Sequence, residues 1–392
     1  PARDRAAAEA VTALRMAAPR GPCATPGPPI VPRAGFGAFR SLVLYANLTA
    51  GWGGAIHGLS ERAHDRPRAG RRGTMSVVLP LPRLTLVSAL CVTSMLAACG
   101  PLGLGTGNAP VVAMAPVLPD PPGPSVESEQ ARLYYAKIQE NLLSQGLMRR
   151  DLAPADAPFT AADLAEDFIN IALYDEYVDA GGTLVARKTE SRLRRWERPV
   201  RIGVEFGAAV PPDQQARDRT DIAAFAARLA RVTGHPIRLD DAAPNFRVLI
   251  LNEDERQATG PRLNEIVPNI DPAAVTATVA MPKSSYCVVF AFSKGTASAY
   301  GQAVAVIRGE HPDLLRLLCI HEEIAQGLGL ANDSPGARPS IFNDDEEFAL
   351  LTRHDELLLR MLYDPRLRSG MTIDQARPLA EMIARDLMAG EG

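Results

Sequence analysis

Residues 319–333 read Cys319-Ile-His-Glu-Glu-Ile-Ala-Gln-Gly-Leu-Gly-Leu-Ala-Asn-Asp333. The part before the glycines predicts a helix on which Glu322 and Gln326 lie one turn apart on one face, with Glu323 beside them. Gly329 is expected to end this helix, because glycine readily adopts the backbone conformation of a helix C-terminus. The chain can then turn back and bring the last residues of the segment towards the helix.

The segment matches the zinc-binding helix of metallopeptidases, H-E-x-x-H-x-x-G-x-x-H, in two alignments, and neither supplies the histidines. When the motif starts at His321, Ala325 occupies the position of the second imidazole. When it starts at Glu322, the glycine is retained and the three histidine positions hold Glu322, Gln326 and Asn332. The second alignment therefore keeps the spacing of a zinc site and replaces all its imidazoles.

A catalytic zinc needs three protein ligands, typically imidazoles or carboxylates, and an open position for water. Gln326 and Asn332 offer neutral carbonyl oxygens, which suit hard cations such as calcium better than zinc. His321 points about 100° around the helix from Glu322 and does not replace a ligand by proximity. Zinc hydrolysis is therefore disfavoured.

Three interpretations of the segment remain open. The polar side chains can anchor the helix to the following turn, the same cleft can bind a peptide or a hard cation, or an unusual peptidase can use Glu323 as general base. The expected binding residues are Glu322, Gln326, Asn332 and Asp333. No cofactor and no metal are expected, and zinc or calcium at Glu322, Gln326 or His321 is the weaker alternative.

Hydrophobic periodicity predicts an α+β fold, with a mixed sheet packed on helices and a helical C-terminal lobe. Strands are expected at 198–207, 246–251, 286–292 and 302–307, and helices at 128–147, 160–173, 211–232 and 372–388. Thr160 and Asp163 form a capping-box pattern. Asn343 is expected to cap a further helix with acids at 344–347, and His354 and Asp355 are placed on its solvated face.

The order of these elements resembles the upper half of zincin metallopeptidases. Three segments are similar to the bacterial lipoprotein-associated domain of unknown function numbered 2927, namely Arg195-Trp-Glu-Arg-Pro-Val-Arg-Ile-Gly-Val-Glu-Phe-Gly207, the run from Glu322 to Asp333, and Ser340-Ile-Phe-Asn-Asp344. The resemblance implies a degenerate zincin-like domain in a lipoprotein setting. It carries no assigned activity.

The first 74 residues hold eleven arginines, four acids and no lysine. We expect this leader, residues 1–74, to be non-native or disordered, with Met75 as the working start. The remaining residues carry 31 basic and 41 acidic side chains. This balance argues against the phosphate-neutralising mode of nucleic-acid binding, so no nucleic-acid partner is expected.

Residues 75–98 resemble a bacterial lipoprotein signal peptide. The apolar run from Leu84 to Ala98 has the length of a secretory h-region and is too short to span a bilayer. It ends in Leu96-Ala97-Ala98-Cys99, which matches the lipobox and predicts cleavage before Cys99 and acylation of its thiol. The alternative is a short buried helix.

A Gly- and Pro-rich tether at 99–127 leads to the folded domain at 128–390. Two cysteines lie outside the leader, signal and lipid anchor, Cys287 and Cys319. In an oxidising periplasm they are a reasonable disulfide pair, with two buried free thiols as the alternative. They lie on a predicted strand and on the motif helix, so a bridge would fix that helix to the sheet.

Together these features predict a lipid-anchored, periplasm-facing protein of the bacterial cell envelope. Its zincin-like domain is expected to bind or scaffold without zinc hydrolysis, so the sequence favours a protein that is not an enzyme. The expected partners are the membrane, through the acyl chains on Cys99, and a protein or peptide. The alternative is an envelope metallopeptidase with unusual ligands.

Overall fold

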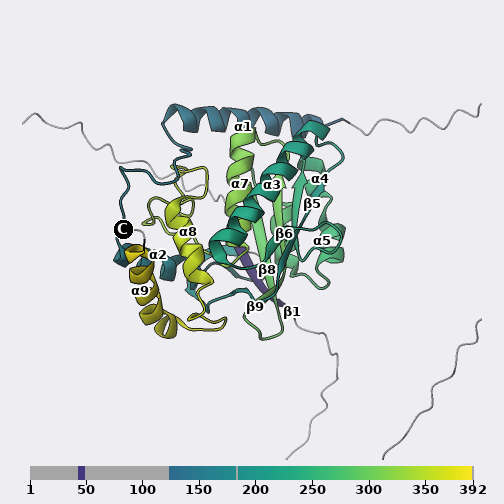
Figure 1. Cartoon of the computed structure of the whole chain (residues 1–392). Helices are drawn as coiled ribbons and strands as arrows, with labels where there is room; N and C mark the ends of the chain where they lie inside the picture. The colour runs from purple at the N-terminus through teal and green to yellow at the C-terminus, as the bar shows by residue number, and fades with distance from the viewer. Residues whose placement is uncertain (1–42, 49–122, 182–183, 391–392) are drawn as a thin grey trace, which may run out of the picture. The chain divides into compact units, whose positions relative to one another are not determined.

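A mixed sheet forms the centre of the structure, a computed structural model that describes residues 43–48, 123–181 and 184–390 (Figure 1). Its strands lie in the order β1 (Val43–Leu48), β8 (Cys287–Lys294), β9 (Ala299–Arg308), β7 (Phe246–Leu251), β5 (Val200–Phe206) and β6 (Ile237–Leu239), and the short β4 (Arg195–Trp196) also pairs with β9. β4, β5, β6, β7 and β9 are parallel. β8 runs antiparallel to β9, and β1 runs parallel to β8.

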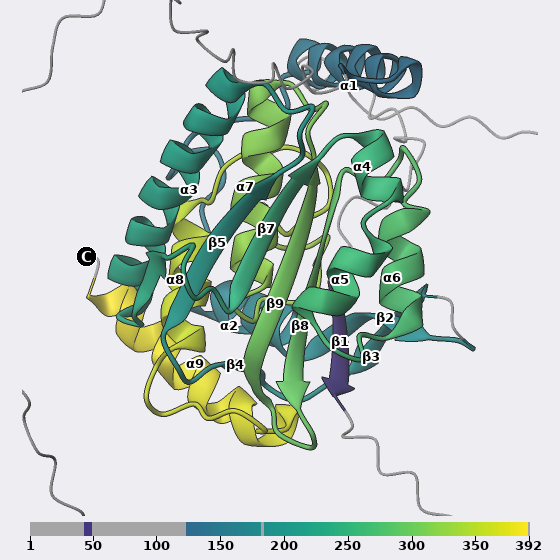
Figure 2. The same ribbon diagram turned by 90° about the vertical axis from the view of Figure 1, so that its right-hand side faces the viewer.

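Helices cover both faces of this sheet, because its central strands are apolar on both sides. One face, with Val289 and Ala305, packs against α3 (Pro212–Thr233) and α7 (Asp313–Gln326). The other face, with Val288 and Phe290, packs against α5 (Gly260–Ile266) and α6 (Pro272–Val279), which follow the short α4 (Glu253–Gln257). Figure 2 shows these helices on opposite sides of the sheet. The predicted α+β fold is confirmed.

The remaining elements surround this core. α1 (Val126–Ser144) crosses the carboxyl end of the parallel strands, β2 (Tyr174–Asp179) and β3 (Leu184–Glu190) form a separate hairpin, and α2 (Ala161–Ala172), α8 (Arg353–Leu362) and α9 (Ile373–Ala389) pack together as a helical lobe (Figure 1). Thr160 and Asp163 form the predicted capping box of α2 through reciprocal hydrogen bonds. Within the described ranges, no helix is both long and apolar enough to cross a membrane.

The prediction of a helix that starts after Asn343 is wrong. Asp344 and Glu346 have positive φ values of 58° and 54°, and the carbonyl of Glu346 accepts a hydrogen bond from the Met148 amide. This long-range backbone pairing holds the segment as a loop. The next helix, α8, begins only after Thr352, which forms a capping box with Asp355.

Within the leader expected at residues 1–74, Val43–Leu48 form β1 and pair with β8. The predicted signal peptide at 75–98, Cys99 and the tether up to residue 122 lie outside the described residues. The β2–β3 hairpin was not predicted from the sequence.

Candidate functional site

α7 carries the Glu-rich segment, and two glycines shape the chain that follows it. At Gly327 an added Cβ would lie 2.5 Å from the Phe246 ring. Gly329 adopts a φ of 131°, and an added Cβ there would lie 2.3 Å from the carbonyl oxygen of Arg194. Only glycine fits this second position without displacing backbone. The helix ends at Gln326, slightly before the predicted glycine, and the chain turns back as expected.

The polar side chains of the segment are buried and meet at the turn. Glu322, Glu323, Gln326 and Asn332 are at most 4% exposed. Gln326 Nε2 donates to Asp333 Oδ1 at 3.2 Å. Asn332 Nδ2 donates to the backbone carbonyl of Asn170, at the end of α2, at 2.8 Å. The structure therefore joins the predicted residues into one group and ties the turn to the helical lobe.

Further carboxylates join this group. Burial raises the pKa of Glu176, on β2, well above its ordinary value, and the charges of Asp333, Asp344 and Glu322 raise it further. A carboxylate oxygen of Glu322 lies within 4.8 Å of one of Glu323. We call Glu176, Glu322, Glu323, Asp333 and Asp344 the acidic cluster. Burial and crowding among these carboxylates disfavour the ionised form of Glu176.

Two members of the acidic cluster were missed by the sequence analysis. Glu176 lies in the hairpin, whose second strand is largely exposed and lacks the apolar alternation that marks a strand. Asp344 had been assigned to the first turn of a helix, and it reaches the cluster because its segment is a loop. No sequence signal pointed to Glu176.

Within the described residues, one group has the spacing of metal ligands, Cys287, Glu322 and Glu323. Cys287 is bonded to Cys319 in a disulfide that links β8 to α7, with Cα atoms 6.0 Å apart. The predicted disulfide is therefore confirmed. A disulfide sulfur is not a thiolate ligand, so two carboxylates remain, fewer than the three protein ligands of a catalytic zinc.

His321 belongs to the hydrophobic core. Its ring stacks on Phe225 with centroids 4.0 Å apart, and its Nδ1 accepts a hydrogen bond from the Leu351 amide at 3.1 Å. Burial lowers the pKa of His321 to about 3, so the ring is neutral. Through these contacts, the His321 ring packs α7 against α3 and against the segment before α8.

His354 and Asp355 are buried, so their predicted placement on a solvated helix face is wrong. His354 Nε2 lies 3.1 Å from Asp167 Oδ2, and its Nδ1 lies 3.8 Å from Asp355 Oδ1. Burial alone would lower the pKa of His354, but the adjacent carboxylates of Asp167 and Asp355 raise it to about 9. The imidazolium therefore joins α8 to α2.

No curated protein matches this chain, and no solved structure matches it. A family model matches residues 161–381, more than half of the chain. The matched range contains α7, the disulfide and every residue of the acidic cluster. The resemblance predicted from three short segments is confirmed by this match. The chain belongs to the family described as Protein of unknown function (DUF2927).

Proposed function

We propose that this protein is a cell-envelope lipoprotein whose zincin-like domain binds an extended peptide along β8, beside the acidic cluster, without zinc hydrolysis. The observation that carries this proposal is the pairing of β1 with β8, which runs without interruption from Val43 opposite Val289 to Leu48 opposite Lys294. An added strand therefore fits the outer edge of β8. Strand addition to a sheet edge is a common mode of peptide recognition, because backbone hydrogen bonds supply affinity for many sequences.

Processing would make this edge available. β1 precedes the lipobox, so cleavage before Cys99 would separate β1 from the domain. β8 would then be an edge strand, although the side chains from Cys287 to Ser293 are buried in the sheet. Apolar edge strands readily pair with other chains. A peptide segment of a partner protein would take the place of β1.

The acidic cluster supports a basic peptide. The disulfide fixes α7, which carries Glu322 and Glu323, beside the start of β8. A peptide on β8 would therefore extend close to the cluster. Burial first, and then the charges of Asp333, Asp344 and Glu322, raise the pKa of Glu176, and a lysine or arginine side chain there would offset those charges.

The ligand chemistry supports binding without hydrolysis. Glu322 and Glu323 supply two carboxylates. The other two ligand positions of the motif hold Gln326 and Asn332, whose neutral amides are weak zinc ligands. Glu323, the general base of the alternative mechanism, is 0% exposed. The alternative function is an envelope metallopeptidase with unusual ligands.

The test measures peptide binding by the chain expressed in a bacterium and extracted from its membranes. The probes are a peptide with the sequence of Val43–Leu48, a copy with two added lysines, and a copy in which Ala46 is replaced by proline. We expect the lysine copy to bind most tightly and the proline copy most weakly, because proline removes a ladder hydrogen bond. Equal binding of the proline copy would overturn strand addition.

Metal analysis and a cleavage assay separate the two functions. Binding without zinc, and without cleavage of the probes, supports the proposal. Stoichiometric zinc that is lost in Glu322→Gln, together with peptide cleavage that is lost in Glu323→Gln, would establish the metallopeptidase instead.

A further inference from the structure

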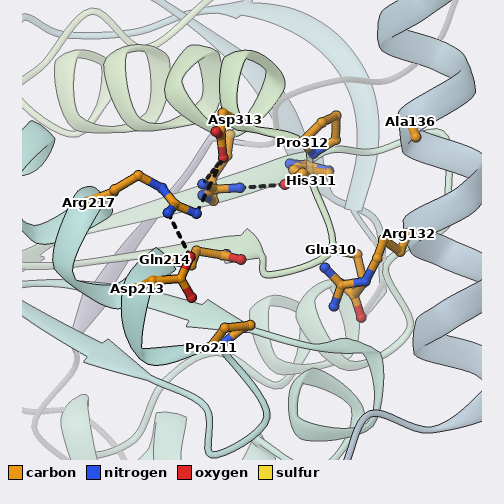
Figure 3. A pocket seen from close by; sticks show the side chains of 11 residues that line it. Arg132, Ala136, Pro211, Asp213, Gln214, Arg217, Glu310, His311, Pro312 and Asp313 are labelled. Carbon is orange, nitrogen blue, oxygen red and sulfur yellow. Dashed lines mark hydrogen bonds and ion pairs between the residues drawn. The ribbon is translucent and has the colours of Figure 1, made fainter.

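A second candidate site lies at the carboxyl ends of the parallel strands. It is a pocket of about 340 Å³ between α1, the loop from β5 to α3 and the loop from β9 to α7 (Figure 3). None of the residues that line it belongs to the acidic cluster. Open parallel sheets bind ligands at this edge, because loops and helix N-termini gather there. Its volume suits a small molecule.

Two helices begin at this pocket, α3 after Pro211 and α7 after Pro312. Neither N-cap residue forms a side-chain hydrogen bond to its helix. The first amides of a helix have no carbonyl partner within it, and the helix dipole adds partial positive charge there. Gln139 of α1 accepts the Leu315 amide, which leaves the preceding amides of α7 for an anionic ligand.

Arg132 supplies a cation that forms only one long ion pair within the described residues. Its Nε lies 3.6 Å from Glu129, and no closer partner occurs among the described residues. The other arginines of the pocket are already paired, Arg217 with Asp213 and Arg316 with Asp218, each at 2.7 Å. Figure 3 shows Arg132 on the side of α1, across the pocket from Asp213 and Arg217. Its guanidinium therefore has donors for a ligand.

Glu310 supplies an acceptor. Its Oε1 accepts from the Ser128 hydroxyl at 2.7 Å and from the Glu253 amide at 2.6 Å. Its Oε2 is buried without a hydrogen-bond partner in the described part of the chain, although the residue lines the pocket and is 1% exposed. Burial raises the pKa of Glu310, and its hydrogen bonds and the charge of Arg308 oppose that rise only in part. A buried acceptor without a donor is costly, and a ligand ammonium group would satisfy it.

We infer that this pocket binds a small zwitterion, a free α-amino acid, with its carboxylate at Arg132 and the amides of α7 and its ammonium group at Glu310 Oε2. The ligand's carboxylate would meet the Arg132 guanidinium, and its ammonium group would meet Glu310 Oε2, which has no hydrogen-bond partner among the described residues. The lining is otherwise balanced, because each remaining arginine has its own aspartate. This inference does not depend on peptide binding at β8.

The test is isothermal titration of the full chain with glycine and alanine, and with acetate and methylamine as single-charge probes. We expect both amino acids to bind and each single-charge probe to bind at least about tenfold more weakly. Arg132→Ala and Glu310→Gln should each weaken amino-acid binding by about tenfold or more. Arg132 lies on a half-exposed helix face, so its variant is expected to fold.

Lys137→Ala is the matched control, because it removes one positive charge from the same helix at an exposed position outside the pocket. It should bind amino acids like the wild type. Failure of both amino acids to bind would overturn the inference. So would unchanged affinity in Arg132→Ala, or acetate binding as tight as that of glycine.

Discussion

His354 Nε2 lies 3.1 Å from Asp167 Oδ2, so a buried ion pair joins α8 to α2. His354 is fully buried, and Asp167 is 8% exposed. Removing one partner of such a pair leaves an uncompensated charge, which is far more destabilising than losing an exposed pair. The contact between α8 and α2 within the helical lobe therefore depends on the protonation of one imidazole.

The first prediction concerns pH. The pKa of His354 is raised from 6.5 to about 9 by folding, so the folded state binds the proton more tightly than the unfolded state. Its contribution to stability should be complete below about pH 6.5, fall as the pH rises, and be lost above about pH 9. The loss is on the order of 3 kcal/mol. Urea unfolding across this pH range measures it, and His354→Asn should flatten the profile. Identical profiles for the variant and the wild type would contradict the assignment.

The disulfide gives the second prediction. Cys287 and Cys319 are 32 residues apart in sequence, so their bond closes a loop worth about 4 kcal/mol in the chain-entropy model. The double variant Cys287→Ala, Cys319→Ala should have a free energy of unfolding lower by about 4 kcal/mol, and its urea midpoint should fall accordingly. Reductant should lower the wild-type midpoint and leave the double variant unchanged. A double variant as stable as the oxidised wild type would show that the bond adds no stability.

The third prediction compares two glycines after α7. Gly329→Ala would place a Cβ 2.3 Å from the Arg194 carbonyl oxygen at a φ of 131°, whereas Gly336→Ala meets nothing within 4 Å. We expect Gly329→Ala to cost more than about 2 kcal/mol and Gly336→Ala to change stability by less than about 0.5 kcal/mol. Urea midpoints of the two variants decide this. Equal midpoints would show that the turn relaxes without cost.

Local patterns predicted the features of the fold that depend on local forces. The alternation of Val200, Ile202 and Val204 marked β5, and the Thr160 cap marked α2, because a strand face and a capping box are read within a few residues. The helix expected after Asn343 failed for the opposite reason. Acids that fit a first helical turn are held in a loop by backbone pairing with Met148, which lies far away in the sequence.

In the candidate site, too, the features that depend on local sequence were predicted and those that depend on tertiary packing were not. The spacing of Glu322, Gln326 and Asn332 was predicted because all three lie on one helix and its following turn. Glu176 was not, since it reaches them from a hairpin by tertiary packing. His354 looked solvated because acids and arginines surround it in sequence, yet its charge is buried against Asp167. Charge pairing across elements has no local signature.

Lipidation gives the fourth prediction. Cys99 ends the predicted lipobox and lies outside the described residues. Cys99→Ser should move the protein from the membrane fraction to the soluble fraction, because the proposed anchor is the acyl chains on this thiol. Cys91→Ser is the control, since it changes a cysteine of the predicted signal peptide and leaves the predicted acylation site in place. Persistent membrane association of Cys99→Ser would count against the lipobox.

The fifth prediction separates two neighbouring carboxylates on β2. Burial and the charges of other acidic-cluster members disfavour the ionised form of Glu176, so Glu176→Gln should stabilise the free protein by about 1 kcal/mol and weaken its binding of the lysine-bearing peptide several-fold. Asp175 instead pairs with Arg194 at 2.6 Å, so Asp175→Asn should destabilise by up to about 1 kcal/mol and leave peptide binding unchanged. Urea unfolding and peptide titration of both variants give the comparison. If Glu176→Gln destabilises the protein as Asp175→Asn does, the Glu176 carboxylate supports the fold and is not kept for a cationic ligand.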